Sequence, residues 1–311
     1  MIGTFDELMA AAARITGCTV VVAAPTNAAT FEAIDVAHRS LPVNFLLIGD
    51  RETINRGIPA DARDPARMSI VHHPDMHSTL RASIEASTQG PRRILMKGSI
   101  DTATLMKAVL DDKSDLRTGG LLSDVFVFEY PPRTQNAFIM ITDGGVTVAP
   151  DLKAKAELIR NAVEVAHALG NPAPRVAVLS ATEFVTPGLP STVDAAALSK
   201  MNERGQIQGC IVDGPLALDN AVSPEAVQEK GIVSQVAGRA EILVAPTIEA
   251  ANCLAKATTL FAASRLAHVI VGARIPILIP SRADRSDAKV LSIALGMIMA
   301  EAAERVVPAV P

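Results

Sequence analysis

The stretch "TVVVAAPTNAATFEAIDVAHRSLPVNFLLIGD" (residues 19–50) contains two apolar runs separated by a helical pattern. Residues 19–25 and 44–50 have the length and β-branched content of buried strands, and residues 28–39 space their apolar side chains as a helix does. A strand, a helix and a second strand in this order form a βαβ unit with parallel strands. We therefore predict a parallel sheet that is covered by helices on both faces.

The same alternation continues through most of the chain. Further strands are predicted at 68–73, 93–98, 175–181, 207–214, 241–246, 268–273 and 275–279, and later helices at 151–169, 192–204, 248–262 and 287–302. The middle differs, because "SDVFVFEYP" (123–131) and "AFIMITDGG" (137–145) are joined by a short turn that contains proline and no helix. This pattern predicts an antiparallel pair of strands.

The length of 311 residues, about twice that of a typical domain, predicts two α/β domains. Pro150 and Asp151 are a start signal for the helix that follows. We place the first domain at 1–140 plus 270–311 and the second at 141–269, with the last helix returning to the first domain.

Composition narrows the class of protein. Apolar residues make up 49% of the chain, charged residues 20%, and the net charge is −4, which disfavours disorder and a nucleic-acid partner. No apolar stretch approaches the ~20 residues of a membrane span, and the N-terminus does not resemble a signal peptide. We expect a cytoplasmic protein without membrane or nucleic-acid partners.

Cysteine and histidine residues give little sign of a metal site. The three cysteines, Cys18, Cys210 and Cys253, are far apart and lie in apolar surroundings, which favours reduced thiols. The segment "HHPDMH" (72–77) is either a metal site or a solvated strand end. The second interpretation is favoured because adjacent histidines of a strand point to opposite faces. We predict no bound metal.

Ligands of α/β proteins lie at the carboxyl ends of strands, where loops lead into helix N-termini. The loops at those positions are rich in small hydroxylated residues, Gly, Asn and Asp; they are residues 24–27, 97–104, 142–145, 180–183, 213–220, 245–252 and 280–287. None matches a P-loop or a G-x-G-x-x-G dinucleotide motif, and no G-x-S-x-G elbow is present. These loops instead predict a site for a polar ligand with phosphate groups.

The loop "PSRADRSD" (280–287) carries the strongest signal. Ser281 and Arg282 follow the strand directly, and the planar guanidinium suits a pair of phosphate oxygens. Asp284 and Asp287 flank a second arginine and are both candidates for a general base. The alternative is an ordinary helix start, where acidic residues are favoured, but it does not explain the Ser-Arg pair.

Two further segments contain candidate binding residues. "GCIVDGPLALDNAVS" (209–223) holds Asp213 after a predicted strand, and "LRTGGLLSD" (116–124) pairs Arg117 with a glycine-rich turn. Ordinary turn chemistry also explains Asp-Gly, so composition alone leaves both interpretations open.

Taken together, long collinear segments resemble the phosphate acetyltransferase and phosphate butyryltransferase family, the butyryl type more closely. The resemblance is strongest from about 94 to 297. It includes "LRTGGLLSDVFVFE", "ITDGGVTVAPDLKAKAELIRNAVEVAHALG", "TVDAAALSKMNERGQIQGCIVDGPLALDNAVS", "APTIEAANCLAK" and "GARIPILIPSRADRSDAKVLSIALG".

The resemblance implies two α/β domains with a cleft between them, in an isocitrate/isopropylmalate dehydrogenase-like fold. It implies the reversible reaction acyl-CoA + phosphate = acyl phosphate + CoA, with an acetyl or short-chain acyl group such as butyryl. Coenzyme A is then a substrate, no cofactor is permanently bound, and the chain is expected to form a homodimer or larger homo-oligomer.

The resemblance also assigns residues. Ser281 and Arg282 match the family's Ser-Arg pair, and the gapless position of the family's aspartate base falls on Ala288, so Asp284 and Asp287 both remain candidates. Lys107 stands where acetyl-type members have a second phosphate-binding arginine. Asn252 and Lys256 are retained; with Arg117 and Asp213 they are predicted to bind substrate.

Two alternatives to an acyltransferase remain. One is a metal-dependent dehydrogenase of the related fold, although the sequence lacks a convincing cluster of aspartates on one helix. The other is a non-catalytic, two-lobed protein that binds CoA or another solute.

Overall fold

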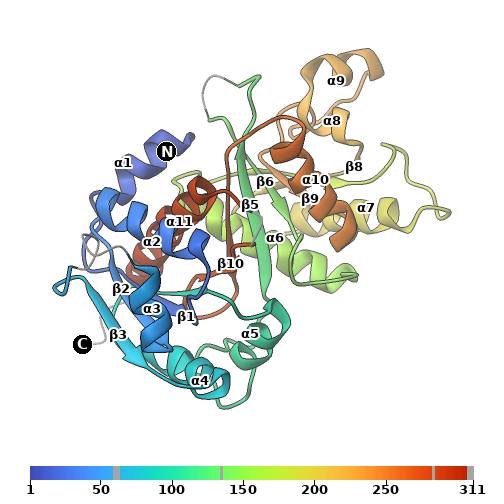
Figure 1. Cartoon of the computed structure of the whole chain (residues 1–311). Helices are drawn as coiled ribbons and strands as arrows, with labels where there is room; N and C mark the ends of the chain where they lie inside the picture. Colours follow the sequence, from blue (N-terminus) through green and yellow to red (C-terminus); the bar gives the residue numbers. More distant parts are fainter. Residues whose placement is uncertain (59–63, 134–135, 282–283, 307–311) are drawn as a thin grey trace. The chain divides into compact units, whose positions relative to one another are not determined.

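A computed structural model describes residues 1–58, 64–133, 136–281 and 284–306 (Figure 1). The chain divides into two compact units: unit 1 comprises Met1–Thr4 and Leu121–Arg265, and unit 2 comprises Phe5–Gly120 and Leu266–Pro311. The sequence placed the changes of domain at 140–141 and 269–270 instead. The first of those positions falls inside a strand whose antiparallel partner precedes it in the chain, and this pairing keeps both strands in unit 1.

Unit 2 is built on a mostly parallel sheet with the strand order β3-β2-β1-β4-β11-β10. Its strands are β1 (Thr19–Ala23), β2 (Asn44–Gly49), β3 (Met68–His72), β4 (Arg93–Lys97), β10 (Leu266–Val271) and β11 (Ile277–Leu278). Its helices are α1 (Phe5–Ala12), α2 (Ala28–Ser40), α3 (Arg51–Gly57), α4 (Met76–Ser87), α5 (Thr102–Val109) and α11 (Ser286–Val306). Thr19 pairs with Asn44 in parallel register, which confirms the predicted βαβ unit, whereas β10 and β11 are antiparallel.

Four helices of unit 2 begin at an Asn or Asp in the short loop after a strand. The side chains of Asn27, Asp50, Asp75 and Asp101 each accept a hydrogen bond from the backbone N–H three residues later, at the starts of α2, α3, α4 and α5. Such caps satisfy N–H groups that a helix leaves unpaired. They fix the loops at the carboxyl ends of the strands.

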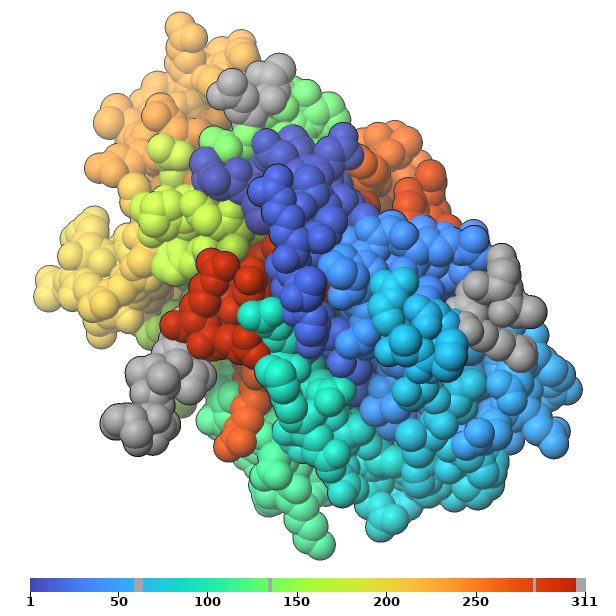
Figure 2. All heavy atoms as spheres, turned by 90° about the vertical axis from the view of Figure 1, so that its left-hand side faces the viewer, coloured from blue at the N-terminus to red at the C-terminus, as the bar shows by residue number. Residues whose placement is uncertain are grey.

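Helix α11 forms part of the core of unit 2. Residues 289–300 are all buried, and the helix packs against α1, α2, β4, β10 and β11. A Cβ on Gly296 would meet the Ile94 side chain at 3.3 Å, so the glycine permits close packing against β4. A helix that is apolar on all sides is expected in a core. Its C-terminal turns (red) reach the surface beside blue segments of the same unit (Figure 2).

The strands of unit 1 follow the order β5-β6-β9-β7-β8. Its strands are β5 (Ser123–Glu129), β6 (Phe138–Thr142), β7 (Arg175–Leu179), β8 (Ile211–Leu216) and β9 (Ile242–Val244). Its helices are α6 (Leu152–Ala168), α7 (Pro190–Glu203), α8 (Leu218–Val222), α9 (Pro224–Lys230) and α10 (Ile248–Leu260). The antiparallel pairing of β5 with β6 confirms the predicted hairpin, and the other pairs are parallel.

Strand β8 differs from its predicted position, 207–214. It extends through Pro215, and it ends the strand order of unit 1. Proline is tolerated at a sheet edge because one side of an edge strand needs no N–H donor. The short helices α8 and α9 follow and were not predicted. Among the described residues, no helix is both long and apolar enough to cross a membrane.

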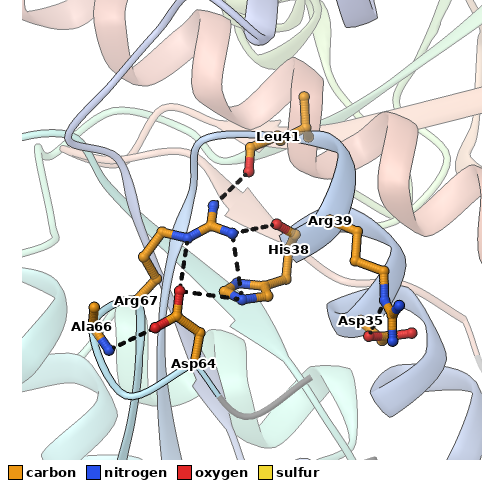
Figure 3. Close-up of polar contacts among 7 residues, drawn as sticks. All are labelled: Asp35, His38, Arg39, Leu41, Asp64, Ala66 and Arg67. Carbon is orange, nitrogen blue, oxygen red and sulfur yellow. Dashed lines mark hydrogen bonds and ion pairs between the residues drawn. The ribbon is translucent and has the colours of Figure 1, made fainter. Parts of the chain in front are cut away.

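Polar contacts surround the Arg67 side chain in unit 2 (Figure 3). The Arg67 guanidinium donates to the carbonyl oxygens of His38 (2.9 Å) and Leu41 (3.1 Å), and it contacts Asp64 Oδ2 at 3.4 Å. His38 is 5% exposed. Burial, and then the nearby Arg67 charge, lower the pKa of the His38 imidazole below its usual 6.5. The fold therefore favours a neutral His38.

The lowered pKa predicts a loss of stability in mild acid. An unfolded chain protonates His38 near pH 6.5, but the folded protein resists this, so stability from His38 is complete above that pH and falls below it. We expect the free energy of unfolding in urea to fall more between pH 7.5 and 5.5 in the wild type than in His38→Gln. Equal losses in the two proteins would contradict this role of His38.

Candidate active site

The carboxyl ends of three neighbouring parallel strands of unit 2, β1, β4 and β11, lie at one edge of the sheet. The loops after β1 and β4 are joined there, because the Thr26 hydroxyl donates to Ser99 Oγ at 2.5 Å and Asn27 Nδ2 donates to it at 3.1 Å. A Cβ on Gly98 would lie 2.4 Å from the Ala24 carbonyl oxygen, so the approach of these loops requires glycine. This edge presents hydroxyl and amide groups.

The exit of β11 brings Ser281 and Asp284 together. The Ser281 backbone N–H donates to Asp284 Oδ2 at 2.6 Å, and the Asp284 N–H donates to the Ser281 carbonyl at 3.2 Å. We call these residues the Ser281–Asp284 pair. Two reciprocal hydrogen bonds fix the Asp284 carboxylate relative to the Ser281 backbone. Arg282 lies outside the described residues.

Two elements, β10 and α11, place side chains against Asp284. His268, on β10, places Nε2 3.8 Å from Asp284 Oδ2 and is only 6% exposed. From α11, the Lys289 ammonium donates to the Asp284 carbonyl oxygen. The Ser292 hydroxyl accepts from the His268 backbone N–H at 3.0 Å and so ties β10 to α11. No sequence motif marks His268 or Lys289 as a site residue.

Asp287, the other candidate base, has different surroundings. Its Oδ1 accepts from Arg285 Nε at 3.2 Å and from the Ala288 N–H at 2.9 Å, and its side chain is 42% exposed. A carboxylate in the first turn of a helix is stabilised by the helix dipole. The helix-start interpretation thus accounts for Asp287.

The other candidates in unit 2 lie on exposed segments. Lys107 is exposed on the last turn of α5. Arg117 pairs with exposed Asp112, and its backbone forms a bridge with Ala273. The bridge places the Arg117 segment beside the connection that leads into β11.

In unit 1, the loop after β6 is organised by the buried side chain of Asp143. Its carboxylate accepts the backbone N–H groups of Asp124, Gly145, Val146 and Thr147 at 2.9–3.1 Å. Burial raises the pKa of Asp143, with a further contribution from the Asp124 charge, while the N–H donors oppose the rise. The sequence pattern predicts this loop at a strand end, but it assigns no role to Asp143.

Asn252 joins that loop to α10. Its Nδ2 donates to the Gly144 carbonyl oxygen at 2.9 Å, from the second turn of the helix. Lys256 is exposed one turn further along α10. Both predicted residues therefore lie on α10, and Asn252 contacts the β6 loop.

Asp213 does not lie in the loop after a strand, as the sequence predicted, but within β8. Its Oδ2 accepts from the Ser234 hydroxyl, and its Oδ1 accepts from the Gly214 N–H at 2.8 Å. The hydrogen bonds of Asp213 thus link β8 to the segment after α9, whereas those of Asn252 lead to the β6 loop.

The described residues contain no group of three His, Cys, Asp or Glu side chains that could hold a metal ion. Within "HHPDMH", His72 Nδ1 accepts from the Arg51 N–H at 3.2 Å, and His77 is in α4. His72 is exposed at the end of β3, which agrees with a solvated strand end.

The sequence matches known proteins over most of its length. A family profile described as phosphate acetyl/butaryl transferase matches residues 76–297. The phosphate acetyltransferase of Thermotoga maritima is 42% identical over 298 residues, which cover 95% of this chain and 100% of that protein. The phosphate butyryltransferase of Clostridium beijerinckii is 40% identical, with coverages of 95% and 97%.

Two solved structures resemble this chain over most of its length. A branched-chain phosphotransacylase from Enterococcus faecalis V583 has a TM-score of 0.79 and 30% identity, covering 91% of this chain and 99% of that one. A protein described as a 4-hydroxythreonine-4-phosphate dehydrogenase from Salmonella typhimurium has a TM-score of 0.57 and 13% identity, with coverages of 91% and 100%. This second likeness confirms the predicted dehydrogenase-like α/β fold. The family match and the relatives together establish that the chain belongs to the phosphate acetyl/butyryl transferase family.

Proposed function

We propose that this protein catalyses the reversible transfer of an acyl group between coenzyme A and inorganic phosphate. The observation that carries the proposal is the Ser281–Asp284 pair, held at the exit of β11 within the segment that matches the family. The acyl group is acetyl or a short chain such as butyryl. Acyl-CoA and phosphate are substrates, and no permanently bound cofactor is required.

We assign the general base to Asp284 and not to Asp287. The Ser281 N–H occupies Asp284 Oδ2, and no hydrogen bond from a described residue reaches Oδ1. We propose that Oδ1 accepts the proton. Asp287 instead pairs with Arg285 on an exposed helix start.

In the direction that consumes acyl phosphate, Asp284 accepts the proton of the CoA thiol as the sulfur attacks the carbonyl carbon. A free thiol has a pKa of about 8.5, so a base is useful at neutral pH. The new bond joins sulfur to carbon, and the carbon–oxygen bond to phosphate breaks. The Ser281 hydroxyl and nearby backbone N–H groups stabilise the oxyanion, and Arg282 stabilises the departing phosphate.

No covalent enzyme intermediate is needed in this reaction. Two substrates bound side by side react directly, because orientation alone can supply ~7–11 kcal/mol of the barrier. The reverse direction uses the same groups: phosphate attacks the thioester, and Asp284 returns its proton to the sulfur.

The remaining predicted residues are proposed to bind the substrates. Lys107, Arg117 and Lys256 carry exposed cations that suit phosphate groups. Asn252 and Asp213 complete the set.

We further propose that the protein is cytoplasmic and a homo-oligomer; light scattering after size-exclusion chromatography tests the oligomeric state.

The function is tested by measuring CoA-thiol release from acetyl-, propionyl- and butyryl-CoA, with and without phosphate. Release that depends on phosphate, with acyl phosphate formed in equal amount, supports the transferase. The ranking of the three substrates reports the size of the acyl site. Release without phosphate indicates a thioesterase and contradicts the proposal. CoA binding without thiol release from any of the three acyl-CoA substrates would favour the non-catalytic alternative.

A further inference from the structure

Lys289 occupies a position that two physical rules disfavour. It is the fourth residue of α11, close to the helix N-terminus, where the dipole favours anions over cations. It is also only 2% exposed, and an ammonium group loses hydration when it is buried. Burial lowers the pKa of Lys289, although the charges of Asp284 and Glu32 oppose this effect. A lysine in this position needs interactions that offset the cost of burying its charge.

A second lysine provides a direct comparison within the same chain. Lys155 is the fourth residue of α6 and is 5% exposed, so it matches Lys289 in both respects. Its Nζ forms an ion pair with Asp194 Oδ2 at 2.6 Å. Among the described residues, the Lys289 Nζ forms no ion pair with a carboxylate; it donates to the backbone carbonyl of Asp284. A buried cation is usually neutralised by a carboxylate, and Lys289 instead holds a loop.

The carbonyl that Lys289 holds belongs to the residue assigned as the base. Asp284 is bound on both sides: its carboxylate accepts from the Ser281 N–H, and its carbonyl accepts from Lys289. Residues 289–300 of α11 are buried, so packing holds the backbone of Lys289 in place. The Lys289 hydrogen bond therefore connects the Ser281–Asp284 pair to the core of unit 2.

We propose that Lys289 is a positioning residue of the acyl-transfer site, which fixes the Asp284 main chain and thereby aims the Asp284 carboxylate. This inference rests on the proposed function. It assigns Lys289 no contact with a substrate. Loss of the ammonium should therefore reduce the rate of the chemical step more than the binding of acyl-CoA.

The first test compares Lys289→Met with Lys289→Arg. Met keeps an unbranched apolar chain but removes the donor, so we expect kcat to fall about 10²-fold, the cost of misplacing a catalytic group by about 1 Å. The KM for acyl-CoA should stay nearly constant. Arg keeps the charge and the donors and should recover part of kcat. Unchanged kcat in Lys289→Met would overturn the proposal.

Lys155→Met is the matched control. Both Met variants lose a buried lysine and should unfold at lower temperature, but Lys155→Met should keep the wild-type kcat when it is assayed well below its unfolding midpoint. An equal fall of kcat in Lys155→Met would reduce Lys289 to a purely structural role. If Lys289→Met does not fold, Lys289→Gln replaces it: the Gln amide is one bond shorter, so kcat should again fall, and an unchanged kcat overturns the proposal.

A double-mutant cycle separates this inference from the proposed function. Because Lys289 acts through Asp284, the effects of Lys289→Met and Asp284→Asn on kcat should not multiply. Multiplication of the two losses would show that Lys289 acts elsewhere. If the wild-type protein shows no phosphate-dependent release of CoA, the proposed function itself has failed, and that result is obtained before any variant is compared.

Discussion

Asp284→Asn should lower kcat for acyl transfer by about 10²–10⁴-fold, the usual contribution of a positioned general base. Asn keeps the size of the side chain and an oxygen that can accept from the Ser281 N–H, so the local hydrogen bond at Oδ2 can persist. It removes the proton acceptor. The KM for acyl-CoA should change little, because in the direction that consumes acyl-CoA Asp284 returns a proton to the departing sulfur and does not bind the acyl-CoA.

Asp287→Asn discriminates between the two aspartates that the sequence leaves open. Asp287 lies three residues further along, is 42% exposed, and pairs with Arg285. Its replacement should cost a small amount of helix stability, about 0.3–1 kcal/mol, and much less activity than Asp284→Asn. Steady-state kinetics of both variants with acetyl- and butyryl-CoA decide the assignment. A larger loss of kcat in Asp287→Asn would move the base to that residue.

The alternation of strands and helices was predictable because each element carries its own local signal. The parallel register of β1 with β2 and the antiparallel hairpin of β5 with β6 both agree with the sequence pattern. Local signals failed where tertiary context decides. The strand predicted at 207–214 is β8, Ile211–Leu216, and its edge position allows it to continue through Pro215.

Local sequence patterns also do not define the limits of the two units, because these limits depend on tertiary contacts. The boundary predicted at 140–141 precedes a helix start that Pro150 and Asp151 signal correctly, whereas the units change at Gly120–Leu121, where no strand or helix begins. Only the pairing of β6 with β9 and β5 shows that the hairpin belongs with the helices that follow it.

The site was predictable in part. Ser281 and Asp284 are three residues apart, and a strand exit followed by a helix brings such residues together. Lys289 and His268 reach the same aspartate from α11 and β10. Nothing local marks His268, because its position near Asp284 depends on the antiparallel pairing of β10 with β11. The candidate residues are distributed over both units: Asn252, Lys256 and Asp213 belong to unit 1.

Arg282→Gln should raise the KM for phosphate by about 10–100-fold and lower kcat/KM by at least as much. Hydrogen bonds to charged groups contribute about 1.5–3 kcal/mol each, and an Arg fork can make two of them to one phosphate. Gln can donate a hydrogen bond but carries no charge. The KM for phosphate of Arg282→Lys should lie between those of the wild type and Arg282→Gln, because Lys retains a point charge and loses the planar guanidinium. Initial rates over a range of phosphate concentrations measure the effect.

Arg285→Gln is the matched control, since it removes the same charge three residues away. Arg285 is 81% exposed and pairs with Asp287, and such exposed ion pairs contribute only about 0–1 kcal/mol. General attraction of phosphate by positive charge would make the two arginines nearly equivalent, and this effect would weaken at high ionic strength. Direct binding by Arg282 makes them unequal, and the difference persists in salt. Equal effects of Arg282→Gln and Arg285→Gln at every salt concentration would remove Arg282 from the site.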